Sequence, residues 1–415
     1  MSILKSMNTG VSGLRANGQA MGVIGDNIAN VNTVGFKAGR ANFSDVMGNL
    51  MLGIGDGTRV GDVQQLFEQG ALEMTGQTTD MAIAGQGFFV VRNPGGDAAD
   101  EFYTRAGQFV LDDQGFITTP AGFRLQGYPA DDAGTLRTTT IGDLQVGDRT
   151  SPPAATTSVD LALNLNPNEA VIVDPWDPND PTATSNYATS VTVYDSLGNA
   201  IQAEVYYRKV DENQWEYHVM VDGEQLEGGT PGELTEISSG TLDFDVDGVL
   251  VDHVQGPTTF NPVGAAAGQE LELNFDGSTQ HAGDSTLRRL RQDGYAAGDI
   301  RGIQIEADGT IMGVFSNGEE MAVGQVVLAQ FDAPEGLQRQ GGNLWARTPD
   351  SGDPRMDAAG VGGRGSIVSG ALESSNVDLS HEFVKMIAAQ RGYQASSKTV
   401  STGDQMLQEV MNLKR

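Results

Sequence analysis

The sequence predicts a mainly β protein with an α-helix at each end, built from discontinuous, nested domains whose terminal helices pair as a coiled coil. Three observations lead to this prediction. Apolar residues recur at helical spacing near both ends, hairpin dipeptides recur throughout the middle, and two linker-like stretches bracket an insertion.

Composition excludes several classes of function. The 415 residues include 25 Lys and Arg against 55 Asp and Glu, a net charge of −30. Phosphate backbones repel such a polyanion, so we expect no nucleic-acid partner. No window approaches the ~18 apolar residues of a membrane span, so we expect no membrane insertion. Polar residues interrupt the first apolar stretch, and we therefore expect no secretory signal peptide. The absence of cysteine excludes disulfides, thiolate metal sites and cysteine nucleophiles.

The N-terminal segment predicts a helix that is weak on its own. Its apolar and small residues alternate by three and four, as in a heptad seam: Leu4, Met7, Val11, Leu14, Gly18, Met21, Gly25 and Ile28. Each glycine within a helix costs about 1 kcal/mol relative to alanine. The helix therefore needs a partner surface, which its glycines allow to approach closely.

The C-terminal segment predicts the partner helix. Asp378 stands where an N-cap is expected. The same spacing follows it, with polar members that make the seam imperfect: Leu379, Phe383, Met386, Gln390, Tyr393, Ser397, Val400, Asp404, Leu407 and Met411. An ordinary helical hairpin within one domain is the alternative interpretation of these two stripes.

The long middle predicts β structure. Residues 87–92 and 108–112 are short apolar runs that end in turn residues. Four dipeptides that favour tight hairpins separate further strand-like runs: Asp222-Gly223, Asp247-Gly248, Asp308-Gly309 and Asn317-Gly318.

Linkers and glycines divide the chain into three predicted domains. Residues 151–157 and 281–284 resemble linkers and bracket an outer β domain at 150–285. The inner β domain is then discontinuous, at 72–149 and 286–363, and residues 1–71 and 364–415 form the helical assembly domain. The glycine-rich stretch 48–61 predicts a hinge between the terminal helix and the inner domain, at Gly53, Gly55 and Gly57.

No pattern predicts a catalytic, cofactor-binding or metal site. The four histidines lack metal-ligand spacing. Residues 360–365 match a dinucleotide fingerprint formally, but a flexible hinge explains them better. Residues 243–248 resemble half of a calcium loop, yet Val254 stands where the bidentate Glu belongs, so a strand explains them better. We expect no enzyme. A β-rich adhesin remains a weaker alternative, since it would not need paired heptads at its two ends.

Motifs at both ends resemble one family. Residues 12–37 are similar to the N-terminal signature of bacterial flagellar rod and hook proteins, above all at Asn27, Asn30, Gly35 and Phe36. Residues 370–379 and 389–394 resemble the closing segment of that family. Residues 80–90, 103–109 and 125–129 resemble its inner domain. The segment 191–199, inside the insertion, is similar to the outer domain of hook proteins, whereas distal rod proteins lack a large insertion.

The resemblance implies a structural subunit of the flagellar hook, which polymerises into a flexible tube and transmits motor torque from rod to filament. A distal rod subunit of the basal body is the alternative. The implied partners are other copies of the chain, the distal rod protein, the hook cap, the hook-filament junction protein and the flagellar export apparatus. The implied location is the hook at the cell surface, reached through the type III channel of the flagellum. The predicted polymerisation interface sets Leu4, Met7, Val11, Leu14, Met21 and Ile28 against Phe383, Met386, Tyr393, Val400, Leu407 and Met411.

Overall fold

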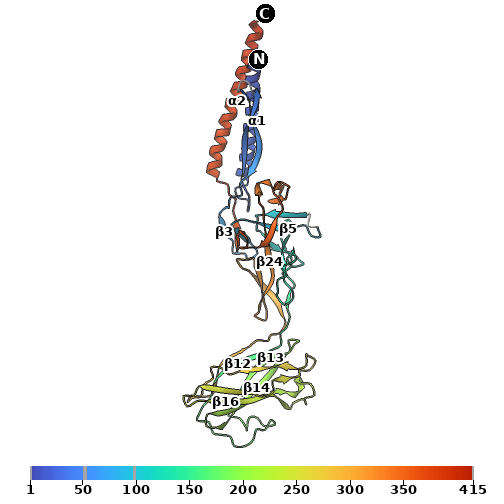
Figure 1. Ribbon diagram of the computed structural model, residues 1–415, viewed down its shortest axis with the longest axis vertical. Helices are drawn as coiled ribbons and strands as arrows, with labels where there is room; N and C mark the ends of the chain where they lie inside the picture. The colour runs from blue at the N-terminus through green and yellow to red at the C-terminus, as the bar shows by residue number, and fades with distance from the viewer. Residues whose placement is uncertain (1, 50–53, 97–99, 414–415) are drawn as a thin grey trace. The chain divides into compact units, whose positions relative to one another are not determined.

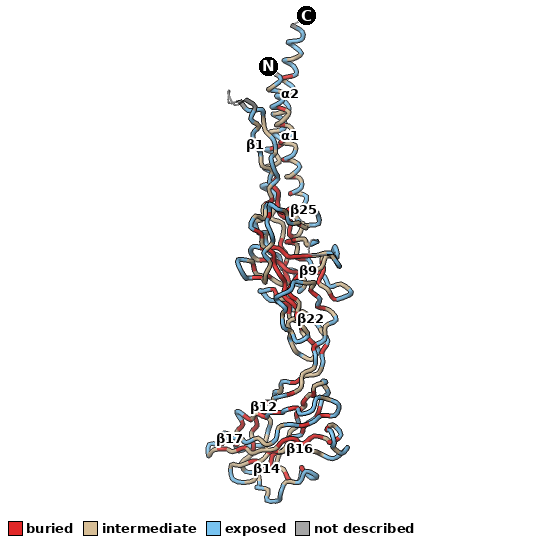
Figure 2. The backbone as a smooth tube through the Cα atoms, turned by 45° about the vertical axis from the view of Figure 1, so that its right-hand side comes forward, coloured by how far each residue is buried: buried red, intermediate tan, exposed pale blue. Residues whose placement is uncertain are grey.

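The computed structural model describes residues 2–49, 54–96 and 100–413. The chain forms two compact units (Figure 1). The first unit spans Met1–Arg149, Gly302–Val314 and Glu320–Arg415, and the second spans Thr150–Arg301 and Phe315–Glu319. Buried residues are concentrated in the sheets of each unit, whereas the helices are mostly half-buried or exposed (Figure 2). The fold is therefore mainly β with helices at both ends, as predicted.

Two long helices belong to the first unit. α1 (Ser2–Ala29) and α2 (Leu379–Leu413) pack side by side (Figure 1). Met7 faces Gly403 and Asn17 faces Gly392, so the helices run antiparallel. The predicted cap is present, because the Asp378 carboxylate accepts a hydrogen bond from the amide of His381 at 3.1 Å.

Small residues of α1 make the contact with α2. Gly10, Gly13, Ala16 and Ala20 are buried. A Cβ on Gly10 would lie 2.9 Å from Val400 Cγ2, and one on Gly13 would lie 2.7 Å from Ser396 Oγ. The buried stripe thus runs about one residue out of phase with the predicted seam, because close helix packing selects small side chains. The larger seam residues flank this contact.

A hairpin lies against α1 where we expected a hinge. β1 (Gly39–Asn49) pairs with β2 (Ile54–Gln65) in an antiparallel ribbon. The amide of Thr58 donates to Ser12 Oγ at 3.2 Å, which attaches the ribbon to the helix. Gly55 and Gly57 lie within β2, so they do not connect the helix to the inner domain. Gly53 lies outside the described residues.

One large sheet dominates the rest of the first unit, in the order β22-β23-β24-β9-β5-β6-β26-β25, with β10, β27, β7 and β8 attached at its sides. Residues 302–305 of β22 (Gly298–Ile305) belong to this unit. The predicted run 87–92 is confirmed as β5, whereas 108–112 contains only the short β7. The strand bounds are β5 (Phe88–Arg92), β6 (Glu101–Thr104), β7 (Val110–Leu111), β8 (Ile117–Thr118), β9 (Arg124–Pro129), β10 (Gly142–Asp143), β23 (Thr310–Phe315), β24 (Glu320–Gln330), β25 (Gln338–Gly341), β26 (Leu344–Ala346) and β27 (Arg355–Ala358). A short 3-10 helix, Pro334–Gly336, precedes β25.

An aromatic cluster fills the core beside this sheet. The buried rings of Tyr103 and Phe331 meet edge to face with centroids 4.8 Å apart, and Phe88 and Trp345 complete the cluster. Two small antiparallel sheets join the flanks of the terminal segments. β3 (Leu72–Met74) pairs with β29 (Ala371–Glu373), and β4 (Met81–Ala84) pairs with β28 (Ser366–Ser369). These pairings bring the chain before α2 next to the chain after α1.

Asp143 makes the stability of the first unit depend on pH. Its carboxylate accepts hydrogen bonds from Gln126 and Arg92, both at 2.8 Å, and from Arg124 at 3.1 Å. Burial raises the pKa of Asp143, but these donors outweigh burial and hold the pKa below the ordinary value of 3.8. A carboxyl group whose folded pKa lies below its unfolded pKa stabilises the fold above about pH 4. This stabilisation is lost as the pH falls through the folded pKa.

We therefore expect the free energy of unfolding of the first unit to decrease below about pH 4. Asp143→Asn should be less stable than the parent chain at pH 7, and the difference should shrink towards pH 2. Denaturant unfolding at stepped pH measures both quantities. The transition of the second unit, which lacks Asp143, is the internal control, and a difference that does not change with pH would contradict the assignment.

The second unit contains separate sheets around its own core. Its sheet orders are β13-β14-β15-β16-β17, β20-β12-β21 and β18-β19, and β11 pairs with the start of β22. Trp215, Tyr207, Tyr217 and Phe275 are buried in the core. The bounds are β11 (Thr150–Ser151), β12 (Ser158–Asn164), β13 (Tyr187–Tyr194), β14 (Ala200–Asp211), β15 (Gln214–Asp222), β16 (Leu234–Phe244), β17 (Leu250–Gln255), β18 (Thr259–Phe260), β19 (Gln269–Glu270), β20 (Glu272–Asn274), β21 (Thr286–Gln292) and β22 (Gly298–Ile305).

Three sequence expectations differ from the structure. The predicted boundary at 285 falls too early, because β21 pairs along β12 and belongs to the second unit. Gly248, Gly309 and Gly318 have positive φ, as tight turns require, but Gly223 does not. Instead, Gly223 begins the 3-10 helix Gly223–Gln225, because the Asp222 side chain caps the amide of Glu224. The structure also groups the predicted helical and inner domains into one compact unit.

Candidate functional site

A buried ionic cluster joins three distant segments of the first unit. Lys37 follows α1, Arg105 follows β6 and Glu373 ends β29. Lys37 Nζ lies 2.6 Å from one Glu373 oxygen, and an Arg105 guanidinium nitrogen lies 3.3 Å from the other. The exposed fractions of the three residues are 1%, 4% and 0%. The cluster is therefore dry and ties both terminal segments to the inner sheet.

The cluster holds two cations but only one carboxylate, so backbone groups supply the remaining hydrogen-bond partners. Lys37 Nζ donates to the carbonyl of Glu68 at 2.7 Å, and Arg105 donates to the carbonyl of Gly85 at 2.8 Å. The amide of Gly70 donates to Glu373 at 2.9 Å. Burial lowers the pKa of Lys37 and of Arg105, and the Glu373 charge opposes this effect at both residues. Both cations therefore depend on Glu373.

Two asparagines add hydrogen bonds between this cluster and the helices, and we call the ionic cluster and these two asparagines together the junction. Asn27 is buried near the end of α1, where its amide exchanges two 2.8 Å hydrogen bonds with the backbone of Gly39 and donates to Glu382 of α2 at 3.1 Å. The Asn376 side chain accepts from the amide of Ala38 and donates to the carbonyl of Leu66, both at 2.8 Å. These bonds fix the hairpin and both helices to one another.

The other residues of the family motif, Asn30, Gly35 and Phe36, also make defined contacts near the end of α1. Gly35 has φ +69°, and its amide donates to the carbonyl of Glu373 at 2.7 Å. A Cβ there would collide with the backbone at Arg105 and Ala106, so this position requires glycine. Phe36 is buried beneath the Arg339 guanidinium, and Asn30 bonds back to Asp26 at the end of α1. The motif residues thus build the junction.

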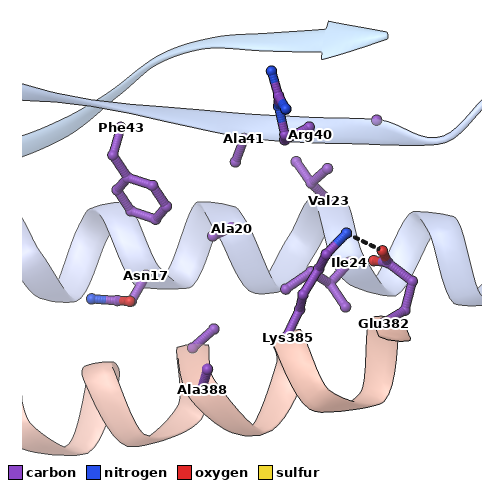
Figure 3. Close-up of a pocket in the computed structure, with 12 residues that line it drawn as sticks. Asn17, Ala20, Val23, Ile24, Arg40, Ala41, Phe43, Glu382, Lys385 and Ala388 are labelled. Atoms are coloured by element: carbon purple, nitrogen blue, oxygen red, sulfur yellow. Dashed lines mark hydrogen bonds and ion pairs between the residues drawn. The ribbon is translucent and has the colours of Figure 1, made fainter. Parts of the chain in front are cut away.

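A groove lies beside the junction, between α1, α2 and β1 (Figure 3). It encloses about 330 Å³ and is lined mainly by apolar atoms, with Ala20, Ile24 and Phe43 among the lining residues. Lys385 and Glu382 form a 2.7 Å ion pair at one end of it. The Phe43 ring is 52% exposed, so part of this apolar surface faces solvent in the subunit.

The structure divides the predicted interface residues into two groups. The half-buried group flanks the contact between the helices and comprises Met7, Val11, Leu14, Met21, Ile28, Met386, Val400 and Leu407. The exposed group comprises Leu4, Phe383, Tyr393 and Met411, with exposed fractions of 61%, 51%, 41% and 72%. The exposed group makes an apolar surface that a single subunit leaves uncovered.

Sequence reasoning missed the charged members of the junction. Lys37, Arg105 and Glu373 each lie inside a run that resembles the family, but none was assigned a role. An isolated charge among glycine and apolar residues was the available signal, because such residues are rarely buried without a partner. The pairing itself joins positions more than 260 residues apart in sequence, as at Arg105 and Glu373.

The described residues contain neither a membrane-spanning helix nor a cluster of metal-ligating side chains. Neither of the long helices has a stretch apolar enough to cross a membrane. Residues 2–49, 54–96 and 100–413 contain no group of three or more His, Cys, Asp or Glu side chains placed to hold a metal ion.

Four family models match successive parts of the chain. They are the flagella basal body rod protein at residues 7–37, the flagellar hook protein FlgE/F/G D1 domain at 82–162, the flagellar basal body protein FlaE D2 domain at 162–295 and the flagellar basal body rod FlgEFG protein C-terminal at 368–413. The D2 match lies entirely within the second unit.

Relatives that match this chain over their full length are also hook proteins. The flagellar hook protein FlgE of Salmonella typhimurium is 37% identical over 415 residues, which cover 99% of this chain and 100% of that protein. The flagellar hook protein FlgE of Borreliella burgdorferi is 34% identical, with 99% and 100% covered. The structure of Helicobacter pylori flagellar hook protein FlgE2 aligns with a TM-score of 0.49 and 19% identity, covering 73% of this chain and 100% of that one. The chain belongs to the flagellar hook protein family.

Proposed function

We propose that this chain polymerises with itself into the flexible tubular hook and acts there as a structural subunit without a catalytic role. The observation that carries the proposal is the uncovered apolar surface of the terminal helices. Burying apolar surface contributes roughly 25 cal/mol per Å², so side chains such as Phe383 and Met411 favour association. Their exposed fractions in the single subunit are 51% and 72%.

The distribution of charge along the chain also supports assembly through the terminal helices. The helical ends are close to neutral: residues 1–47 hold four basic and two acidic side chains, and residues 371–415 hold five of each. The residues between them therefore carry all of the net negative charge of the chain, which is −30 overall. Near-neutral ends can pack tightly against neighbouring copies, while the acidic remainder stays hydrated. Contacts between different surfaces of identical copies extend into a helical polymer when the rotation between copies does not close a ring.

The proposal also covers location and partners. We infer that the chain is exported through the flagellar channel without a signal peptide and assembles outside the cell. The distal rod protein, the hook cap and the hook-filament junction protein would adjoin the polymer, and the export apparatus would deliver the chain. A distal rod subunit is not favoured, because the relatives that match over their full length are hook proteins.

Aspartates at two exposed apolar positions should impair polymerisation. Phe383 and Tyr393 are 51% and 41% exposed, so Phe383→Asp with Tyr393→Asp should leave the fold of the subunit intact. Burying an aromatic side chain stabilises by about 2 kcal/mol, so we expect the critical concentration to rise at least about thirtyfold. Sedimentation of polymer across a concentration series measures this change.

The matched control adds the same two charges to the same helix at exposed polar positions, as Gln394→Asp with Gln405→Asp. This variant should polymerise within about threefold of the parent chain, because surface substitutions away from contacts have small effects. Equal critical concentrations for the two double variants would overturn the assignment of the exposed helical surface. A parent chain that forms no polymer would overturn the proposed function.

A further inference from the structure

The second unit has very few exposed cations. Its bounds contain six Lys and Arg against 26 Asp and Glu. Arg208 and Lys209 are buried, where they donate to backbone carbonyls such as those of Asp174 and Glu169. The four exposed cations are Arg288, Arg289, Arg291 and Arg301. Three of the four therefore lie within four consecutive residues.

These three arginines lie on an edge strand. β21 pairs with β12 on one side and ends the sheet β20-β12-β21. Arg288 donates to Thr279 Oγ1 at 3.4 Å and Arg289 donates to the carbonyl of Asp276 at 3.0 Å. Leu290, between them and Arg291, is 41% exposed. We call residues 288–291 the basic edge.

Within the described part of the chain, no carboxylate forms an ion pair with the basic edge. Asp160 stands opposite Arg291 in the strand register, but its carboxylate accepts from Asn274 at 3.1 Å. Charges on edge strands also prevent strands of other copies from pairing with them. That protection works with either sign, so it does not explain three arginines in a unit with more than four times as many acids as bases.

A complementary surface lies elsewhere on the same unit, at the hairpin of β16 and β17, residues 243–252. Asp243 and Asp252 stand directly opposite each other in the register, an arrangement that is destabilising for like charges. Asp247 and Asp252 are exposed, as are Val246 at 93% and Val251 at 69%. Asp243 accepts a hydrogen bond from Gln214 at 2.9 Å, but no ion pair in the described residues includes Asp243, Asp247 or Asp252. The hairpin thus combines carboxylates that form no ion pair with exposed valines, and the basic edge combines guanidiniums that form no ion pair with an exposed leucine.

We propose that the basic edge of one copy docks on the 243–252 hairpin of a second copy of this chain. The contact would neutralise the Asp243 and Asp252 pair and cover Leu290 with Val246 or Val251. The two surfaces are different regions of one unit, so the contact is heterologous and repeats along a polymer. The inference rests on the proposed function, because it assigns a second contact between polymerised copies in addition to the helical one.

Cysteine cross-linking in the polymer tests the contact, since the chain has no native cysteine. Full-length copies carrying Leu290→Cys are mixed with copies carrying Val246→Cys, polymerised and oxidised. We expect disulfide-linked dimers that contain one copy of each variant. Val173→Cys replaces Val246→Cys in the matched control, because Val173 is 90% exposed but lies in another loop. This control should give at least about tenfold less cross-linking, since a disulfide needs Cα atoms within about 7 Å.

Charge exchange tests the electrostatics. Adding Arg288→Glu, Arg289→Glu and Arg291→Glu to the Leu290→Cys copy should lower the cross-linking yield at least about tenfold, because like charges then face each other. Adding Asp247→Lys and Asp252→Lys to the Val246→Cys partner should restore the yield to within about twofold of the original.

The outcomes separate the two proposals. Polymers that form normally but cross-link no better at Val246 than at Val173 would overturn the docking contact and leave the proposed function standing. Vesicles with about 30% anionic lipid test a different partner for the same arginines. If the parent chain bound these vesicles through the basic edge and the polymer gave no cross-link, docking between copies would be overturned. A parent chain that does not polymerise would overturn the proposed function, and this inference with it.

Discussion

Replacing Glu373 by glutamine should lower the free energy of unfolding of the first unit by about 3–5 kcal/mol, because it leaves two buried cations without their shared anion. Glu373 is fully buried and contacts Lys37 at 2.6 Å and Arg105 at 3.3 Å. Glutamine has nearly the same shape, so the loss reports charge and not a cavity. Each kcal/mol shifts the melting temperature of a unit of this size by roughly 2–4 °C, so we expect a decrease of about 10 °C.

Differential scanning calorimetry measures this effect with an internal reference. The second unit has its own core and does not contain Glu373, so its transition should not move. Asp353→Asn is the matched control: it breaks the exposed Arg347–Asp353 pair at 3.2 Å and should change stability by less than about 0.5 kcal/mol. Equal transitions for Glu373→Gln and Asp353→Asn would show that the buried cluster does not hold the unit together.

A double variant separates the ionic contribution from packing. Lys37→Met removes one of the two cations, so Lys37→Met with Glu373→Gln should be more stable than Glu373→Gln alone. Groups in one ion-pair network couple by about 0.5–3 kcal/mol. If the two single losses simply add, then Lys37 and Glu373 do not stabilise each other.

The sequence predicted correctly those helices and strands for which a short local pattern of residues is a sufficient signal. The strand β5 follows a continuous apolar run, and α2 begins at the capping residue Asp378. The hairpin of β1 and β2 was missed, because its strands are polar and rich in glycine. Its register is set by backbone pairing and by contact with α1. Periodicity alone could not predict a strand that lacks an alternating apolar face.

The helix contact shows a second kind of limit. Apolar spacing favours the large residues Leu14 and Met21 as the seam, but the buried positions are Gly13, Ala16 and Ala20. Hydrophobicity does not distinguish a residue that is buried within a subunit from one that only a neighbouring subunit would bury. The junction was beyond sequence reasoning for a related reason. Its partners are far apart along the chain, and only the fold brings Lys37 to Glu373.

Excising the second unit should leave a first unit that folds alone and polymerises into tubes of altered curvature. Ser151 of β11 pairs with Gly298 of β22, so the chain leaves and returns at neighbouring positions. Replacing residues 152–297 by Asn-Gly joins these two residues by a two-residue hairpin turn, which that dipeptide favours. The aromatic core of the first unit, which contains Tyr103 and Phe331, is not cut. We expect its melting temperature to stay within about 3 °C of the parent value.

The effect on the polymer separates assembly from bending. The terminal helices and their exposed apolar residues remain, so tubes should form at a critical concentration within about tenfold of the parent. The acidic surfaces of the second unit are hydrated, and polar, water-containing contacts can rearrange without losing a dry core. Removing them should therefore change the curvature seen by electron microscopy of the polymer. A chain shortened in this way that forms tubes of unchanged curvature would place flexibility in the first unit, and one that forms no tubes would place essential assembly contacts in the second.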